Sequence, residues 1–316
     1  MHALPNVKNI EAFRAWRADA SQCLPAALDI ARSHGLPHGD PHLFATGTNL
    51  VVALDDKLVL KIFPPMLRHQ FASERSSLSQ LRGRISVPIP EIVLEGERDR
   101  WPYLVITRLS GMIGAQAWPT LPEHQKERVL YRIGETIAEV QRVPPGELSE
   151  IEPRWDEFIP RQIAGCRARH RRLGLAQKYL DGLDEFLRDA ALLIPMDAPP
   201  VILTGEYIPE NFLLVCEGGQ WQLAGLIDFG DVFTGWREYD LLGPSTFMTA
   251  GMPRRVRSLL HGFGYTRADM TPALTRRLMA LSLLHRASDL NRQMCIDDWQ
   301  QKAGNLYELE QLLWPI

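Results

Sequence analysis

The chain has 316 residues, of which 45% are hydrophobic and 23% charged, so it can bury one large core or two smaller ones. Its formal net charge of -3 gives none of the basic excess that binding to nucleic acid or to an anionic membrane usually requires. The N-terminus has no basic segment followed by an apolar run, and no stretch approaches the roughly eighteen apolar residues of a membrane span. We therefore expect a cytoplasmic protein, monomeric by default, that binds a small polar or cationic molecule.

The four cysteines do not suggest a metal site or a disulfide. They lie far apart, they form no CxxC pair, and no histidine stands at zinc-ligand spacing from them. We expect reduced thiols at Cys23, Cys166, Cys216 and Cys295.

The first third of the chain is predicted to be a small sheet with helices. Apolar residues recur at helical spacing until Gly35 and Pro37, and short runs rich in β-formers follow. The expected elements, in chain order, are a helix at 9–33, a meander of strands at 43–46, 50–54 and 58–63, a helix at 69–81, and strands at 87–96 and 101–109.

From about residue 110 the apolar pattern becomes helical, and only 201–228 interrupts it. That segment predicts a hairpin with its turn at 217–219, embedded among helices. Further helices are expected at 254–262, 271–294 and 299–314. The whole pattern predicts an α+β protein with an N-terminal lobe, 1–108, and a larger, mostly helical C-terminal lobe, 109–316, joined by a hinge.

Lys61 is the first residue that suggests chemistry. It lies in the apolar run 58–63, where loss of hydration would cost an ammonium group several kcal/mol unless an anion paired with it. Glu74, on the predicted helix 69–81, could be that anion, as in the lysine and glutamate pair that holds nucleotide phosphates in kinases. The alternative is an edge-strand lysine that reaches solvent beside a solvated glutamate.

A second group of residues has the spacing of a kinase active site. Glu206 is followed five residues later by Asn211, and Asp228 ends a predicted strand of the hairpin, within Asp-Phe-Gly-Asp. Mg²⁺ prefers oxygen ligands, which Asn211 and Asp228 supply, whereas Glu206 could accept the proton of an acceptor hydroxyl. The Asp-Phe-Gly sequence alone is weak, but its order behind Lys61 and Glu74 makes the pattern specific.

The loop Gly47-Thr48-Asn49 between two predicted strands could cover a triphosphate through its backbone N–H groups. A structural turn explains a single glycine equally well. The loop matches neither a Walker A sequence nor a dinucleotide-binding fingerprint.

With these residues in place, the sequence resembles the aminoglycoside phosphotransferase family, and within it the hygromycin B phosphotransferases of the actinobacterial type. The resemblance follows most of the chain in the same order. Its segments are HGLP at 34–37, GTN at 47–49, KIF at 61–63, VPIP at 87–90, WPYLV at 101–105, DFGD at 228–231, LH at 284–285 and LWP at 313–315.

The resemblance implies a bilobal protein-kinase-like fold that uses ATP or GTP with Mg²⁺. Lys61 would contact the nucleotide phosphates, Asn211 and Asp228 would hold the metal, and the adenine would lie at the hinge near Val105, Thr107 and Leu109. In this family a cationic antibiotic lies against acidic side chains of the helical lobe. The candidates here are Glu206, Asp231, Glu238, Asp240 and Asp289, with Asp297 and Asp298 beyond them.

The sequence departs from the family at one point. Thr204-Gly205-Glu206 stands where His-Gly-Asp is usual, so the loop lacks an imidazole that braces it and its carboxylate is longer by one methylene. Misplacement of a reacting group by about 1 Å can cost roughly a hundredfold in rate.

The leading hypothesis is therefore phosphorylation of an aminocyclitol antibiotic, with hygromycin B the first compound to test, which would confer resistance. A second hypothesis keeps the fold but changes the acceptor to a macrolide, an amino alcohol or a sugar. A third is a pseudokinase that binds nucleotide without turnover. The presence of Lys61, Glu74, Asn211 and Asp228 together argues against the third.

Overall fold

The computed structural model describes residues 3–45 and 47–316, and the chain divides into two compact units. The first comprises Met1–Arg82, Pro88–Ser110 and Leu226–Val232, and the second comprises Gly83–Val87, Gly111–Gly225 and Phe233–Ile316. The sequence-based prediction places one boundary near residue 108, whereas each of these units is made of three separate segments of the chain. In particular, the segment that contains Asp228 counts with the first unit.

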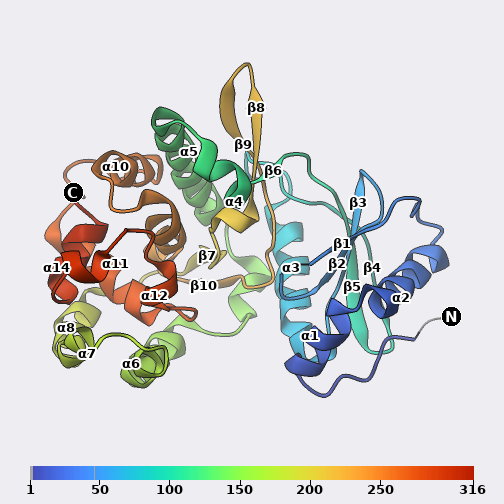
Figure 1. The fold of residues 1–316 in the computed structure, drawn as a ribbon, viewed down its shortest axis with the longest axis horizontal. Helices are drawn as coiled ribbons and strands as arrows, with labels where there is room; N and C mark the ends of the chain where they lie inside the picture. Colours follow the sequence, from blue (N-terminus) through green and yellow to red (C-terminus); the bar gives the residue numbers. More distant parts are fainter. Residues whose placement is uncertain (1–2, 46) are drawn as a thin grey trace. The chain divides into compact units, whose positions relative to one another are not determined.

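Within its described residues, the first unit contains an antiparallel sheet of five strands in the order β1-β2-β3-β5-β4, accompanied by helices (Figure 1). The predicted meander of the first three strands is confirmed, although residue 46 lies outside the described residues. The elements are α1 (Ile10–Ala18), α2 (Ala20–Ser33), β1 (His42–Phe44), β2 (Leu50–Ala53), β3 (Leu58–Ile62), α3 (Arg68–Leu81), β4 (Ile92–Arg98) and β5 (Trp101–Thr107).

The opening helix expected at 9–33 is two helices, because Asp19 interrupts it. Asp19 has extended backbone angles, ends α1 and begins α2, and its carboxylate accepts a hydrogen bond of 3.0 Å from the Ser21 N–H. A short acidic side chain that bonds its neighbouring backbone competes with helix continuation and favours a cap instead.

The two faces of the sheet have different partners. Leu60 and Ile62 of β3 are fully buried in a core that includes Phe13 of α1 and Ile30 of α2. Successive side chains of a strand point to opposite faces, so Lys61 faces the other way, toward α3. The sheet thus places one charged residue of an apolar strand beside α3.

The second unit is mostly helical and contains two small sheets, one in the order β6-β8-β9 and one pairing β7 with β10. Its elements are β6 (Met112–Ile113), α4 (Gly114–Ala117), α5 (Glu123–Arg142), α6 (Trp155–Arg172), α7 (Gln177–Asp181), α8 (Leu183–Ala190), β7 (Val201–Leu203), β8 (Phe212–Glu217), β9 (Gln220–Leu226), β10 (Phe233–Gly235), α9 (Leu242–Pro244), α10 (Pro253–Gly262), α11 (Pro272–Leu284), α12 (Leu290–Gln293), α13 (Trp299–Lys302) and α14 (Leu306–Leu313).

The predicted hairpin with its turn at 217–219 is confirmed: it is formed by β8 and β9, and Gly218 and Gly219 have positive φ in the turn. β7 lies outside the hairpin and pairs with β10. Two helices of this unit differ from the sequence-based expectation. The helix expected at 271–294 breaks at His285, whose φ of -56° and ψ of 138° end α11. The helix expected at 299–314 breaks between Lys302 and Leu306. Apolar periodicity does not register such short interruptions.

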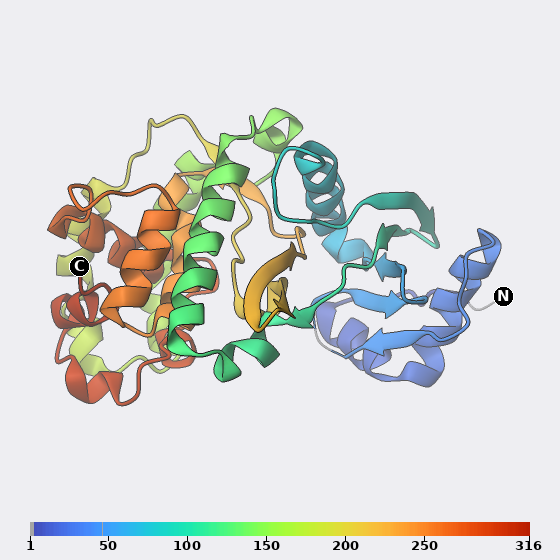
Figure 2. The same ribbon diagram turned by 90° about the horizontal axis from the view of Figure 1, so that it is seen from above.

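α5 and α10 lie side by side in the second unit (Figures 1 and 2), and glycines allow their close approach. A Cβ on Gly262 would lie 1.9 Å from the Tyr131 carbonyl oxygen, and one on Gly134 would lie 2.3 Å from that of Leu259. Neither position could hold a larger residue without separating the helices.

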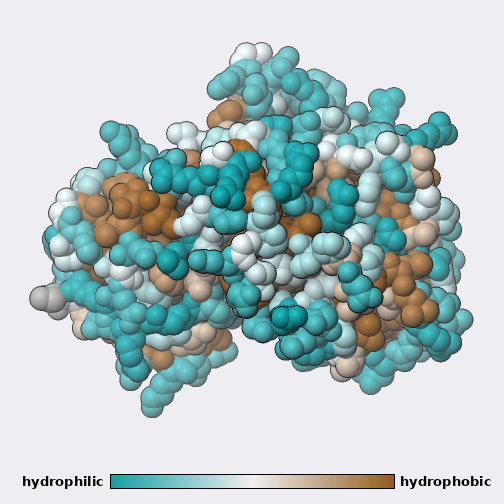
Figure 3. Space-filling view, turned by 180° about the vertical axis from the view of Figure 1, so that it is seen from behind, coloured by the Kyte–Doolittle hydropathy of each residue, from teal (hydrophilic) through white to brown (hydrophobic). Residues whose placement is uncertain are grey.

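The surface agrees with the composition. In the face that Figure 3 shows, hydrophilic residues predominate, and apolar patches lie among them. Among the described residues, no helix has the length and hydropathy that a bilayer span needs. All four cysteines are unpaired; Cys23 and Cys166 are buried, and Cys216 and Cys295 are exposed.

Candidate active site

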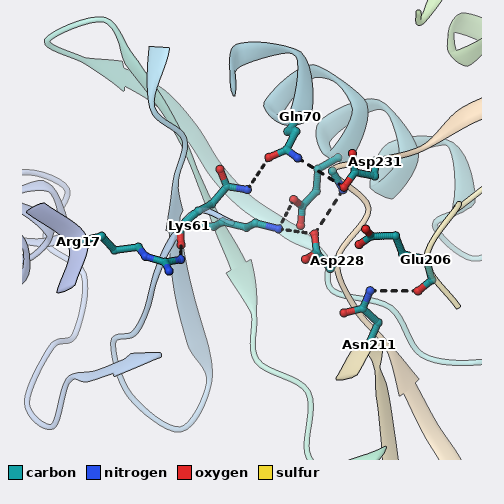
Figure 4. Close-up of polar contacts among 10 residues, drawn as sticks. Arg17, Lys61, Gln70, Glu206, Asn211, Asp228 and Asp231 are labelled. Carbon is teal, nitrogen blue, oxygen red and sulfur yellow. Dashed lines mark hydrogen bonds and ion pairs between the residues drawn. The ribbon is translucent and has the colours of Figure 1, made fainter. Parts of the chain in front are cut away.

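Lys61 forms a buried ionic cluster in the first unit (Figure 4). Its Nζ lies 2.5 Å from Glu74 Oε2 and 2.8 Å from Asp228 Oδ1, and the residue is only 5% exposed. The pairing expected with Glu74 is confirmed. The alternative of an edge-strand lysine is wrong, because β3 lies between β2 and β5.

The cluster sets the charges of its members. Burial acts to lower the pKa of Lys61, but Asp228 and Glu74 outweigh it, so the pKa rises above its ordinary value and the ammonium stays charged. Burial raises the pKa of Glu74, although Lys61 opposes this. Burial also acts to raise the pKa of Asp228, but the charge and hydrogen bond of Lys61 lower it on balance. A fixed cation with an ionised Asp228 beside it results.

Asp228 also has an unusual backbone conformation. Its φ is 66°, in the left-handed region that residues other than glycine rarely adopt. Such strain costs on the order of 1 kcal/mol and is concentrated at functional sites. Its side chain remains 35% exposed, so the carboxylate can still meet a ligand.

Further polar side chains of the first unit surround the loop after β1. Asn49 Nδ2 donates to Gln70 Oε1 over 3.1 Å, and Gln70 Nε2 lies 3.5 Å from Asp231 Oδ2 (Figure 4). Arg17 Nη1 donates to the Gly47 and Asn49 carbonyls. Gln70 lies one helical turn before Glu74, a spacing that could have identified it, whereas no local pattern marks Arg17.

The loop contains the glycine and the threonine that were expected to cover a nucleotide, and both residues are accessible to solvent. Gly47 and Thr48 are exposed, and Gly47 has a φ of 97°. Of the residues expected near an adenine, Val105 is fully buried in the core with α1 and α2, whereas Thr107 and Leu109 are partly exposed. A ligand at the end of β5 would therefore meet the side chains of Thr107 and Leu109, but not that of Val105.

The 204–211 loop of the second unit places Glu206 in a partly exposed position. Asp240 accepts hydrogen bonds of 3.0 Å from the Thr204 N–H and 2.8 Å from the Gly205 N–H. Asn211 Nδ2 donates to the Glu206 carbonyl over 3.1 Å (Figure 4). These bonds fix the backbone on both sides of the Glu206 side chain.

Two of the acidic residues expected to bind substrate have structural roles instead. Glu238 is fully buried, with Arg277 Nε at 2.5 Å and the Tyr265 hydroxyl at 2.5 Å from its oxygens. Asp240 is 2% exposed and supports the 204–211 loop. Burial raises the pKa of Asp240 to about 7, although the Gly205 and Thr204 N–H groups act in the opposite direction. Neither carboxylate is accessible to a ligand.

The remaining acidic candidates are accessible. Asp231, in the first unit, and Asp289, in the second, are partly exposed, and Asp297 and Asp298 are exposed. One oxygen of Asp289, Oδ1, is buried without a hydrogen-bond partner in the structure.

Asn211, in the second unit, and Asp228, in the first, each offer an oxygen of the kind that a hard cation binds. Among the described residues, no three His, Cys, Asp or Glu side chains are grouped to hold a metal by themselves. Asn211 uses its Nδ2 on the Glu206 carbonyl, so its amide oxygen is the ligand atom, and Asp228 offers an ionised carboxylate. Mg²⁺ characteristically takes one or two protein oxygens and completes its shell with phosphate and water.

Comparison with known sequences agrees with this chemistry. Residues 46–274, more than half of the chain, match the phosphotransferase enzyme family. The aminoglycoside 3'-phosphotransferase of Streptomyces fradiae is 28% identical over 170 residues, which cover 50% of this chain and 58% of that protein. The alignment thus spans little more than half of the relative's length.

Solved structures establish the fold. Wild-type aminoglycoside 2'-phosphotransferase-IIIa, in its GDP complex, matches with a TM-score of 0.69 at 18% identity, over 92% of this chain and 98% of that one. The macrolide 2'-phosphotransferase of Brachybacterium faecium matches with a TM-score of 0.57 at 18% identity, over 82% and 90% of the two chains. The predicted α+β, protein-kinase-like fold is confirmed. Together with the family match, these findings show that the chain belongs to the phosphotransferase enzyme family.

Proposed function

We propose that the protein transfers the terminal phosphoryl group of ATP or GTP to a hydroxyl group of a small molecule. The ionic cluster of Lys61, Glu74 and Asp228 carries the proposal. Burying the charges of Lys61 and Glu74 is costly, and a fixed ammonium beside a strained, ionised aspartate has a clear use in holding nucleotide phosphates.

Each residue has a chemical role in this proposal. Lys61 would bind phosphate oxygens, and Asn211 and Asp228 would be the residues that hold Mg²⁺, which would supply positive charge to neutralise the phosphates. The exposed Gly47 and Thr48 cover the phosphates through backbone N–H groups. Glu206 accepts a hydrogen bond from the acceptor hydroxyl, orients it, and takes its proton as the new P–O bond forms and the bond from the terminal phosphorus to the leaving ADP or GDP breaks.

The acceptor that we propose is a cationic aminoglycoside or aminocyclitol, with hygromycin B the first compound to test. The accessible carboxylates Asp231, Asp289, Asp297 and Asp298 support this, since they suit a polycation. The relatives named aminoglycoside phosphotransferases support the same class. In this proposal the enzyme is cytoplasmic and monomeric, and it confers resistance to the antibiotic.

A macrolide is the second candidate acceptor, because a macrolide phosphotransferase shares the fold. A macrolide carries fewer positive charges and a larger apolar surface than an aminoglycoside. The two acceptors should therefore respond differently to removal of acidic side chains. Asp289→Asn should weaken binding of a polycation and leave that of a macrolide nearly unchanged.

The test is incubation of the purified protein with Mg²⁺ and ATP or GTP, and a panel of aminoglycosides, macrolides, amino alcohols and sugars. Mass spectrometry should reveal a product heavier by one phosphoryl group. Glu206→Gln should lower kcat by about 100-fold or more with little change in nucleotide affinity. Glu210→Gln, an exposed glutamate of the same loop, is the matched control. A protein that binds nucleotide but phosphorylates no compound would be a pseudokinase, and the proposal would be wrong.

A further inference from the structure

Side chains form hydrogen bonds to consecutive peptide groups next to Glu206. Asn211, at the end of the loop, is one of these residues, and the others lie outside the loop. Asp240 holds the N–H groups of Thr204 and Gly205, and Asn211 holds the carbonyl of Glu206. Between them, the carbonyl of Gly205 lies 3.3 Å from Nε2 of His285, which is 80 residues away in the sequence. His285 therefore contacts the peptide group that directly precedes Glu206.

The surroundings of His285 determine which of its nitrogens carries the proton. The Ala287 N–H donates to His285 Nδ1 over 3.2 Å, so Nδ1 is an acceptor. The hydrogen must then be on Nε2, which donates to the Gly205 carbonyl. Burial lowers the pKa of His285 to about 3, and the charge of Arg286 acts in the same direction, so the ring stays neutral.

The ring is also fixed by stacking. Its centroid lies 4.6 Å from that of Tyr239, with 20° between the planes, and Tyr239 is 1% exposed. Tyr239 is the neighbour of Asp240 in the 3-10 turn Arg237–Leu241. One turn therefore supports both the carboxylate and the imidazole that hold the 204–211 loop. The interruption of α11 at His285 is what directs the ring to this position.

We propose that His285 is a positioning residue for Glu206, supplying from the end of α11 an imidazole brace for a loop that has Thr204 in place of the usual histidine. The proposal rests on the proposed function, since positioning matters only if Glu206 orients an acceptor. The brace itself is a physical property of the loop, and it can be measured without any substrate.

The experiment compares the full-length wild type with two variants. His285→Phe keeps a ring to stack on Tyr239 but removes the Nε2 donor, and His285→Gln keeps an N–H donor at a similar reach. His124→Phe, at an exposed histidine of α5, is the matched control. Hydrogen exchange of the 201–211 segment is followed by mass spectrometry, together with kcat, KM and nucleotide affinity.

We expect His285→Phe to exchange the 201–211 segment about tenfold faster and to lower kcat by about tenfold or more, with KM for nucleotide unchanged. His285→Gln should restore a large part of both. Unchanged exchange in His285→Phe would overturn the brace, and faster exchange with unchanged kcat would overturn its positioning role. Faster exchange throughout the second unit, or no recovery in His285→Gln, would indicate a purely structural residue and also overturn it. If the wild type phosphorylates no acceptor, the proposed function and the positioning role both fail, and the exchange comparison still decides whether the brace exists.

Discussion

Removal of Lys61 should destabilise the first unit more than removal of Glu74, because the two substitutions leave different charges behind. In Lys61→Met, Glu74 loses its counterion while its side chain is only 2% exposed, so it must either stay charged without a partner or bind a proton. In Glu74→Gln, Lys61 still has Asp228 at 2.8 Å, and the Asp228 side chain is 35% exposed and partly hydrated. The cluster is therefore asymmetric.

The expected sizes follow from burial. Breaking a buried pair by removing one partner costs about 3–5 kcal/mol, so Lys61→Met should lower the free energy of unfolding by about that amount. Glu74→Gln should cost about 1–2 kcal/mol, since a neutral amide can still accept a hydrogen bond from Lys61. The double variant that combines Lys61→Met with Glu74→Gln removes both charges, and its free energy of unfolding should exceed that of Lys61→Met by about 2 kcal/mol.

Urea denaturation followed by tryptophan fluorescence measures these differences, and the first unit contains the reporter Trp101, which is 1% exposed. Lys57→Met, at an exposed lysine of the turn before β3, is the control and should change the midpoint little. A double variant as unstable as Lys61→Met, or equal effects of the two single substitutions, would refute the asymmetric cluster.

Three further predictions concern other parts of the chain. Since the pKa of Asp240 is raised to about 7 when folded, against about 3.9 unfolded, the folded protein binds the extra proton between these values. The stability of wild type relative to Asp240→Asn should therefore fall as pH rises from about 4 to about 7, by at most roughly 1.4 kcal/mol per pH unit, and a pH-independent difference in denaturation would contradict this. Gly262→Ala should cost about 1–3 kcal/mol, because its Cβ would meet the Tyr131 carbonyl oxygen at 1.9 Å. Gly165→Ala, in α6 with nothing within 4 Å of the new Cβ, should instead stabilise by about 0.5–1 kcal/mol, and thermal unfolding that ranks the two the other way would refute the close packing. Arg17→Met should weaken nucleotide binding by about tenfold, measured by calorimetry, because it removes the donors to the Gly47 and Asn49 carbonyls. The exposed Arg14→Met is its control, and equal affinities would exclude a role for Arg17 in holding the loop.

Much of the first unit was predictable because local rules govern it. Alternating apolar runs and a short turn specify the meander β1-β2-β3, and an isolated charge in such a run requires a partner. Glu74 could be named as that partner from its place on the next helix. The helix breaks at Asp19 and at 285–289 were missed, because each interruption is short while the apolar period continues beyond it.

The roles of the acidic residues were not predictable in the same way. Glu238, Asp240 and Asp231 all carry a carboxylate, and nothing in the sequence separates them. The fold nevertheless buries Glu238 and Asp240 and leaves Asp231 partly exposed. What distinguishes them is the set of donors that surrounds each carboxylate. Those donors come from remote segments, such as Arg277, which is 39 residues from Glu238.

The sequence by itself determined the order and spacing of Lys61, Glu74, Glu206, Asn211 and Asp228, which match the succession of strand, helix and loop residues that kinases use. Their roles in nucleotide and metal binding are our proposal. Only the tertiary structure decided what holds these residues in place. Arg17 reaches Gly47 across 30 residues, Asp240 reaches Gly205 across 35, and His285 reaches it across 80. Contacts between residues so far apart in the sequence depend on how whole helices and strands pack, and no local pattern of residues encodes that packing.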